Sequence, residues 1–254
     1  MAIFFRLLLA IAVLLAGARA VADDKAVRLI SLDWQPYTGA SLRDQGVSAA
    51  VVKAAFQAMG YAVDIDFYPW ARATHLSESD NDYAGVFPVY YSADRARRFN
   101  CSNPIGHSPL GFAERNDARV AWSVLGDLAP YKIGVVRDYV NTQALDDMVA
   151  TGRLAVDVAS NDAQNLQKLA HRRIDLAIVD RNVLDYLLKN TPELQGFNDL
   201  RFNSRLLEDR KLYICFKRGG ANDRVAARFN AGLQKIDVEA IIAQYMQSNG
   251  LEKN

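Results

Sequence analysis

Side chains that commonly bind metals or form catalytic triads are few and widely spaced in this sequence. Its 254 residues include two cysteines and three histidines, His75, His107 and His171. Their spacing matches no zinc ribbon, zinc finger or iron–sulfur site. The chain also has no Gly-x-Ser-x-Gly, His-Glu-x-x-His or phosphate-loop motif. We therefore expect neither a metal nor another cofactor.

Two charged residues are better placed to bind a ligand. Arg95 carries a planar guanidinium that can hold a carboxylate through two parallel bonds, although with Arg97 and Arg98 it is also consistent with a solvated basic helix. Asp180 ends an apolar stretch, and its carboxylate can face a cleft or cap the next helix. From the residues alone, both readings of each side chain stay open.

Further candidates lie at a helix start and on loops. Asn141 and Thr142 begin a predicted helix, where free N–H groups and a hydroxyl can meet a carboxylate or serve only as a cap. Three aromatic residues follow predicted strands, outside any core periodicity: Trp34, Tyr37 and Trp70. We expect them to stack on a ligand or to fill the core. Arg72 adds a second cation or forms a surface salt bridge.

The overall charge excludes several function classes. The chain has 30 basic and 29 acidic residues, and half of its residues are hydrophobic. This balance is typical of a globular protein and lacks the basic patch that nucleic-acid binding requires. Small molecules or proteins are the expected partners, with no nucleic acid.

The first 22 residues are predicted to be a secretory signal peptide. Arg6 precedes an apolar run over residues 7–15, and small residues allow cleavage after Ala20 or Ala22. The run is shorter than the ~20 residues that span a bilayer. We expect a soluble exported protein, with no membrane insertion after removal of the signal and with its cysteines in an oxidising compartment.

The remaining chain alternates apolar runs with amphipathic segments, which predicts an α/β fold. Predicted strands cover residues 27–32, 61–67, 83–89, 110–113, 132–136, 174–180 and 212–216. Predicted helices cover residues 48–59, 142–151, 161–171 with Ser160 as N-cap, 181–188, 223–236 and 238–247. No repeat or low-complexity linker interrupts this order.

The order of these pieces resembles the type 2 periplasmic solute-binding proteins of the polar amino-acid ABC-transporter group, bacterial extracellular solute-binding protein family 3. The segments that carry the resemblance are 33–37 (DWQPY), 59–60 (MG), 68–73 (YPWARA), 92–95 (SADR), 99–105 (FNCSNPI), 132–135 (KIGV), 173–180 (RIDLAIVD) and 212–217 (LYICFK). The resemblance implies two α/β lobes that close over a ligand in the cleft between them. Lobe 1 would comprise residues 23–105 and 214–254, and lobe 2 residues 106–213.

The resemblance also implies roles for individual residues. Arg95, with Ser92 in the position of the family's threonine, would hold the ligand's α-carboxylate, and Asp180 would receive its ammonium group. The preceding strand departs from the family, because it has bulky residues and Pro88 where small hydroxyl residues are common. That departure argues against an ordinary α-amino acid, although the carbonyls of Pro88 and Tyr90 remain possible acceptors.

The implied function is a periplasmic, monomeric receptor that captures a small polar, carboxylate-bearing, amino-acid-like solute for an ABC permease or a membrane sensor. The alternative is an enzyme on the same fold, similar to cyclohexadienyl dehydratase. Such an enzyme needs a tuned acid in the cleft. The candidate acids are Glu78, Asp82, Asp138 and Asp180.

Both cysteines fall in the segments that the resemblance places between the lobes. Cys101 and Cys215 would then be neighbours in space despite 113 intervening residues. Export permits a disulfide between them. Two buried free thiols are the alternative, because Ile214 and Phe216 flank Cys215.

Overall fold

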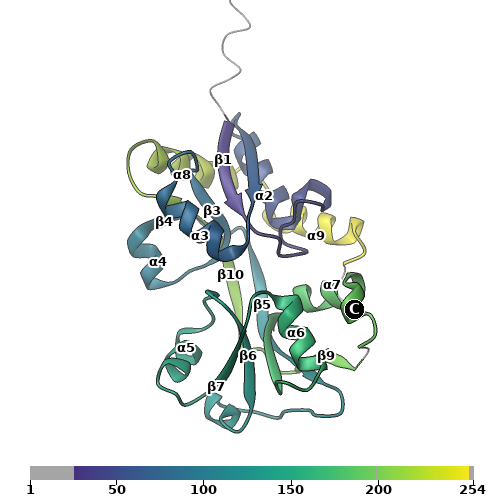
Figure 1. The fold of residues 1–254 in the computed structure, drawn as a ribbon. Helices are drawn as coiled ribbons and strands as arrows, with labels where there is room; N and C mark the ends of the chain where they lie inside the picture. The colour runs from purple at the N-terminus through teal and green to yellow at the C-terminus, as the bar shows by residue number, and fades with distance from the viewer. Residues whose placement is uncertain (1–25, 198, 252–254) are drawn as a thin grey trace, which may run out of the picture.

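The structure is a computed structural model that describes residues 26–197 and 199–251. It is an α/β fold, as the sequence predicts, and Figure 1 shows two halves stacked one above the other. The strands are β1 (Ala26–Ser31), β2 (Ala62–Phe67), β3 (Gly85–Tyr90), β4 (Phe99–Cys101), β5 (Gly106–Arg115), β6 (Lys132–Val136), β7 (Ala155–Ala159), β8 (Leu176–Asp180), β9 (Leu200–Phe202) and β10 (Glu208–Lys217). The helices are α2 (Val47–Gln57), α3 (Trp70–Ser79), α4 (Ala93–Arg98), α5 (Gln143–Ala150), α6 (Asp162–Ala170), α7 (Arg181–Asn190), α8 (Gly220–Leu233) and α9 (Val238–Ser248).

Two long antiparallel strands, β5 and β10, join the halves (Figure 1). The strand order is β2-β1-β3-β10-β5-β8-β6-β7, and β4 and β9 pair with β10 and β5. The first half of β10 pairs with the start of β5, and its second half pairs with β3 and β4. The far end of β5 pairs with β8 and β9. The parallel strands on either side therefore belong to different halves.

Helix α2 fixes the loop after β1 against the first half. Gly46 precedes the helix at φ 106°, and a Cβ there would lie 2.4 Å from the carbonyl oxygen of Tyr37, so a glycine is required. The buried face of α2 includes Ala55 and Phe56, as the periodicity predicts. A Cβ on Gly232 of α8 would lie 2.0 Å from the Ala55 carbonyl oxygen, so the two helices approach closely.

Two local predictions are wrong. Asn161, rather than Ser160, caps α6, because its side chain accepts a bond from the Gln164 N–H at 2.9 Å while the Ser160 hydroxyl donates to the Gln164 side chain. Trp70 begins α3 instead of lying on a loop, since Pro69 is the N-cap of that helix. The sequence of α3 is polar and only Ala73 and Ser77 are buried, so the helix has no apolar stripe that would predict it.

The last strand is longer in the structure than the predicted apolar segment, residues 212–216. β10 extends to Glu208, because its exposed first residues pair with β5. Strand β7 was not predicted, since most of its residues are exposed or only partly buried at the edge of the sheet.

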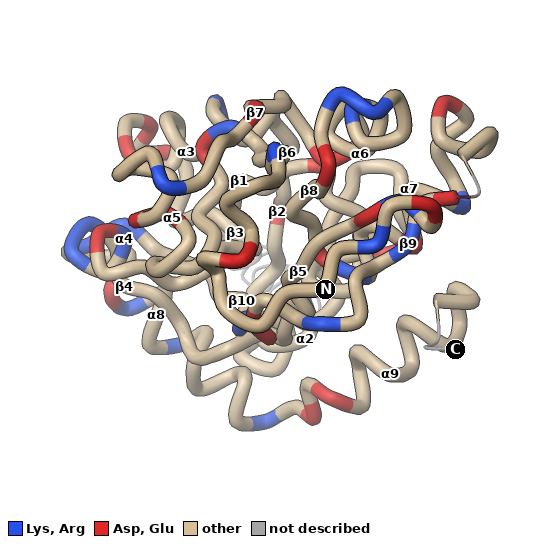
Figure 2. The backbone as a smooth tube through the Cα atoms, turned by 90° about the horizontal axis from the view of Figure 1, so that it is seen from below, with Lys and Arg blue, Asp and Glu red and all other residues tan. Residues whose placement is uncertain are grey.

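The surface of the described residues is mixed in charge. Figure 2 shows Lys and Arg interspersed with Asp and Glu along the outer helices and loops. Within residues 26–197 and 199–251, no helix is both long and apolar enough to cross a membrane. The predicted signal peptide, residues 1–22, lies outside the described residues.

A disulfide joins Cys101 of β4 to Cys215 of β10. The two residues lie directly opposite each other in the antiparallel pair of these strands. Cys215 is fully buried. The bridge closes a long loop that contains the whole second half, since its ends are 114 positions apart.

We predict that the denatured, unreduced mature protein has no free thiol. In the chain-entropy model, closing so long a loop is worth up to about 5 kcal/mol, so reduction should lower the midpoint of urea unfolding. Thiol counting and urea unfolding with and without reductant measure both effects. Two free thiols per chain would contradict the bridge.

Candidate functional site

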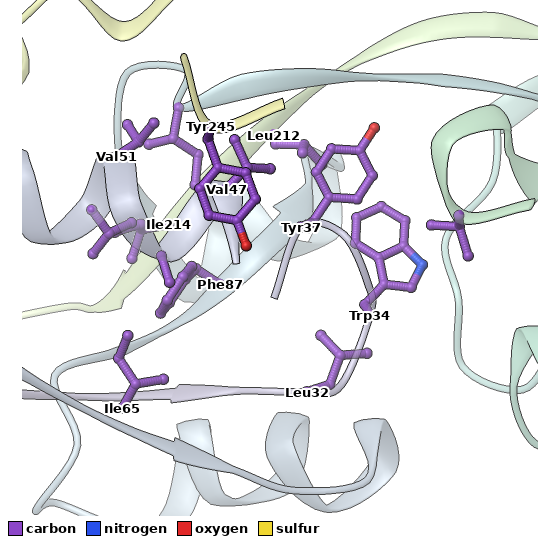
Figure 3. Packing of buried hydrophobic residues seen from close by; sticks show 14 of the residues in the cluster. Leu32, Trp34, Tyr37, Val47, Val51, Ile65, Phe87, Leu212, Ile214 and Tyr245 are labelled. Atoms are coloured by element: carbon purple, nitrogen blue, oxygen red, sulfur yellow. The ribbon is translucent and has the colours of Figure 1, made fainter. Parts of the chain in front are cut away.

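A cavity of about 40 Å³ lies at the meeting of the two halves. Its lining residues are Leu32, Trp34, Trp70, Pro88, Val89, Tyr90, Arg95, Tyr139, Val140 and Leu212. Figure 3 shows Trp34 and Tyr37 beside each other above Leu32, and their rings stack at 4.5 Å between centroids. Five of the sequence-predicted site residues, Trp34, Trp70, Pro88, Tyr90 and Arg95, come together around this cavity.

Arg95 is the charged group of the cavity lining. It lies on α4, which Ser92 caps by accepting a bond from the Arg95 N–H at 3.1 Å. Its side chain is buried, with the residue 9% exposed, and Nη1 donates to the Tyr90 carbonyl oxygen at 2.6 Å. Burial, followed by repulsion from Arg98, lowers the pKa of Arg95 to about 10.

Arg95 has no salt bridge to any described acidic residue. By contrast, Arg97 and Arg98 on the same helix are exposed and both pair with Asp94. The three arginines are therefore not one solvated basic face. A buried cation without an acidic partner is costly, and an anion entering the cavity would relieve that cost.

Asp180 lies at the end of β8 and is 2% exposed. Its carboxylate accepts bonds from the Tyr37 hydroxyl at 2.9 Å, the Ser108 hydroxyl at 2.5 Å and the Val183 N–H at 2.9 Å. Burial raises its pKa to about 6. Asp180 therefore caps α7 and also contacts the other half, but it is not among the residues that line the cavity.

A second buried acid, Asp162, was not singled out in the sequence. It is the first residue of α6, is 7% exposed and accepts a bond from the Tyr139 hydroxyl at 3.2 Å. Burial raises its pKa to about 7, and repulsion from Asp180 adds to the rise. In the sequence, Asp162 directly follows a capping residue, and an acidic residue in the first turn of a helix is usually exposed. No sequence pattern therefore predicts that Asp162 is buried.

The aromatic residues turn their polar atoms away from the cavity. The Trp70 indole N–H donates to the Asp138 carbonyl oxygen at 3.0 Å. The Tyr90 hydroxyl bonds to Ser108 at 2.6 Å. The Trp34 indole N–H faces Asp162 and lowers the pKa of that carboxyl group. The N–H makes no hydrogen bond of normal geometry. The ring surfaces are left to form the cavity walls.

The remaining predicted binders lie elsewhere. Thr142 caps α5, and the Asn141 carbonyl accepts a bond from Arg210. Arg72 is exposed and stacks over Tyr68 at 4.8 Å. Tyr37 lines a separate cavity of about 330 Å³ beside α9. The structure therefore does not bring these four residues to the aromatic cavity.

Three of the four candidate catalytic acids are on the surface. Glu78 pairs with Arg98, and Asp82 pairs with Arg28 at 3.6 Å. Asp138 is exposed and has φ 62°. Asp180 alone among them is buried at the meeting of the halves.

Comparisons with known proteins identify the fold. No protein-family model and no curated protein matches the sequence. A histidine kinase sensor domain with similarity to periplasmic binding proteins matches with a TM-score of 0.73 at 20% identity, covering 87% of this chain and 96% of that one. An amino-acid ABC transporter substrate-binding protein from Streptococcus pneumoniae, bound to L-arginine, matches at 0.72 and 14% identity over 92% and 99%.

A third match is the GluR0 ligand-binding core from Nostoc punctiforme in complex with L-glutamate. Its TM-score is 0.70 at 15% identity, covering 87% of this chain and 98% of that one. Together these matches show that the chain has the two-lobed fold of periplasmic binding proteins, as the resemblance in the sequence implied.

We predict that the unliganded protein is less stable at pH 8 than at pH 5. The folded protein raises the carboxyl pKa values of Asp180 and Asp162 from 3.8 to about 6 and about 7, so it binds protons more tightly than the unfolded chain does. Stability from these groups is present at low pH and is lost as pH rises to about 7. The expected loss is about 1–3 kcal/mol, or several degrees in Tm.

Thermal unfolding of D162N and D157N separates this effect from general charge effects. D162N should flatten the pH dependence, because asparagine keeps the shape without titrating. Asp157, whose pKa Lys132 and Lys168 lower, is the matched control, and D157N should retain the decline. A D162N profile parallel to the wild-type profile would exclude the buried acid as the cause.

Proposed function

We propose that this protein is an exported receptor that binds a small carboxylate-bearing solute between its lobes and presents it to a membrane partner. One observation carries the proposal: Arg95 is buried at the cavity, and no described acidic residue pairs with it. A guanidinium in that setting favours a carboxylate through two charge-assisted bonds.

The lobes are assigned to residues 23–105 with 214–254 and to residues 106–213. The strand β10 supports this division, because its first half pairs with β5 of lobe 2 and its second half pairs with β3 and β4 of lobe 1. Hydrogen bonds across the division, such as that from Tyr37 to Asp180, favour the closed arrangement. Ligand would shift the lobes further toward closure in proportion to its preference for that state.

The membrane partner is an ABC permease or a sensor. Both kinds of protein occur among the structural matches, as a transporter's substrate-binding protein and as a kinase sensor domain. The predicted signal peptide supports a periplasmic location, and we propose a monomer.

The dehydratase alternative receives less support. An acid catalyst must reach the reacting group. Among the described residues that line the cavity, none carries a carboxyl, imidazole or thiol group. The arrangement therefore favours binding over catalysis.

We predict that R95M removes carboxylate binding without destabilising the unliganded protein. Loss of the charge-assisted bonds should weaken binding at least 30-fold, or about 2 kcal/mol. Removing a buried cation that has no acidic partner offsets the loss of its bond to Tyr90. Calorimetric titration and thermal unfolding measure the two effects, and Tm should fall by no more than about 2 °C.

R97M is the matched control, because Arg97 lies on the same helix but is exposed and paired with Asp94. It should bind within about twofold of wild type. If R95M binds within threefold of wild type, or if R97M and R95M lose affinity equally, Arg95 is not the anchor for the anion.

A further inference from the structure

The cavity combines one cation with walls built mainly from apolar and aromatic side chains. Apart from Arg95, its lining consists of aliphatic and aromatic residues and Pro88. The Tyr90 carbonyl oxygen already accepts a bond from Arg95. The described lining therefore matches an anion attached to an apolar body.

The two acids that could receive an ammonium group are covered. The Tyr37 and Ser108 hydroxyls both contact Oδ2 of Asp180, and the Val183 N–H contacts Oδ1. Asp162 faces Tyr139 and Trp34, whose rings form part of the cavity wall. Neither carboxylate reaches the cavity lining.

An ammonium group in this cavity would meet two unfavourable conditions. It would lie near the Arg95 guanidinium, which has the same charge. It would also lose its hydration without gaining a carboxylate partner. Asp180 would become available only if Tyr37 gave up its bonds to Asp180 and Asn182. A carboxylate without an amine avoids both costs.

We propose that the cleft selects carboxylates that carry no ammonium group. This inference rests on the proposed function, because it requires Arg95 to be the anion site. Tyr37 acts as the specificity residue, since its hydroxyl occupies Asp180 from the opposite lobe.

The direct test compares ligands that differ only in the amine. Wild-type protein is titrated with acetate against glycine and with propionate against alanine, followed by tryptophan fluorescence, because Trp34 and Trp70 line the cavity. We expect propionate to bind at least tenfold more tightly than alanine.

The variant D180N adds a second readout. Asparagine can still cap α7 through its carbonyl oxygen, and its NH2 group can donate to the Tyr37 and Ser108 hydroxyls in place of accepting from them, so the fold should persist. Because Asp180 does not face the ligand, D180N should bind propionate within threefold of wild type, whereas R95M should lose at least 30-fold. If D180N fails to fold, the ligand pairs on the wild-type protein still decide the question.

Three results would overturn the inference. If alanine binds as tightly as propionate and R95M removes that binding, the selection against ammonium is wrong but the proposed function stands. The same conclusion follows if D180N at unchanged Tm weakens propionate binding more than tenfold. If no carboxylate binds, the proposed function fails as well.

Discussion

The bond network of the Asp180 carboxylate is the interaction on which the arrangement of the site depends. It joins Tyr37 from the loop after β1, Ser108 from the crossing strand β5 and the start of α7 at Val183. A carboxylate that is 2% exposed requires such partners, because burying it unpaired would cost several kcal/mol. Of the three bonds that satisfy the acid, the one from Tyr37 also joins the two lobes.

This network also determines the chemistry of the cavity. With Asp180 bonded to Tyr37 and Asp162 bonded to Tyr139, both acids are covered by aromatic side chains. The guanidinium of Arg95 is then the charge that remains at the cavity.

Sequence patterns predict most of the framework but only part of the site. The amphipathic helix α2 and the strand β8 ending at Asp180 follow from periodicity, because their burial is regular along the chain. The position of Arg95 follows from the family resemblance. The burial of Asp162 and the bond from Tyr37 to Asp180 depend on how distant segments meet, and no local pattern records that.

A crystal structure of the protein with bound propionate tests the central claim most directly. The account predicts a carboxylate oxygen within about 2.7–2.9 Å of the Arg95 guanidinium, with the bond between Tyr37 and Asp180 intact. A propionate bound away from Arg95, or an Asp180 carboxylate released from Tyr37 and turned toward the ligand, would contradict it.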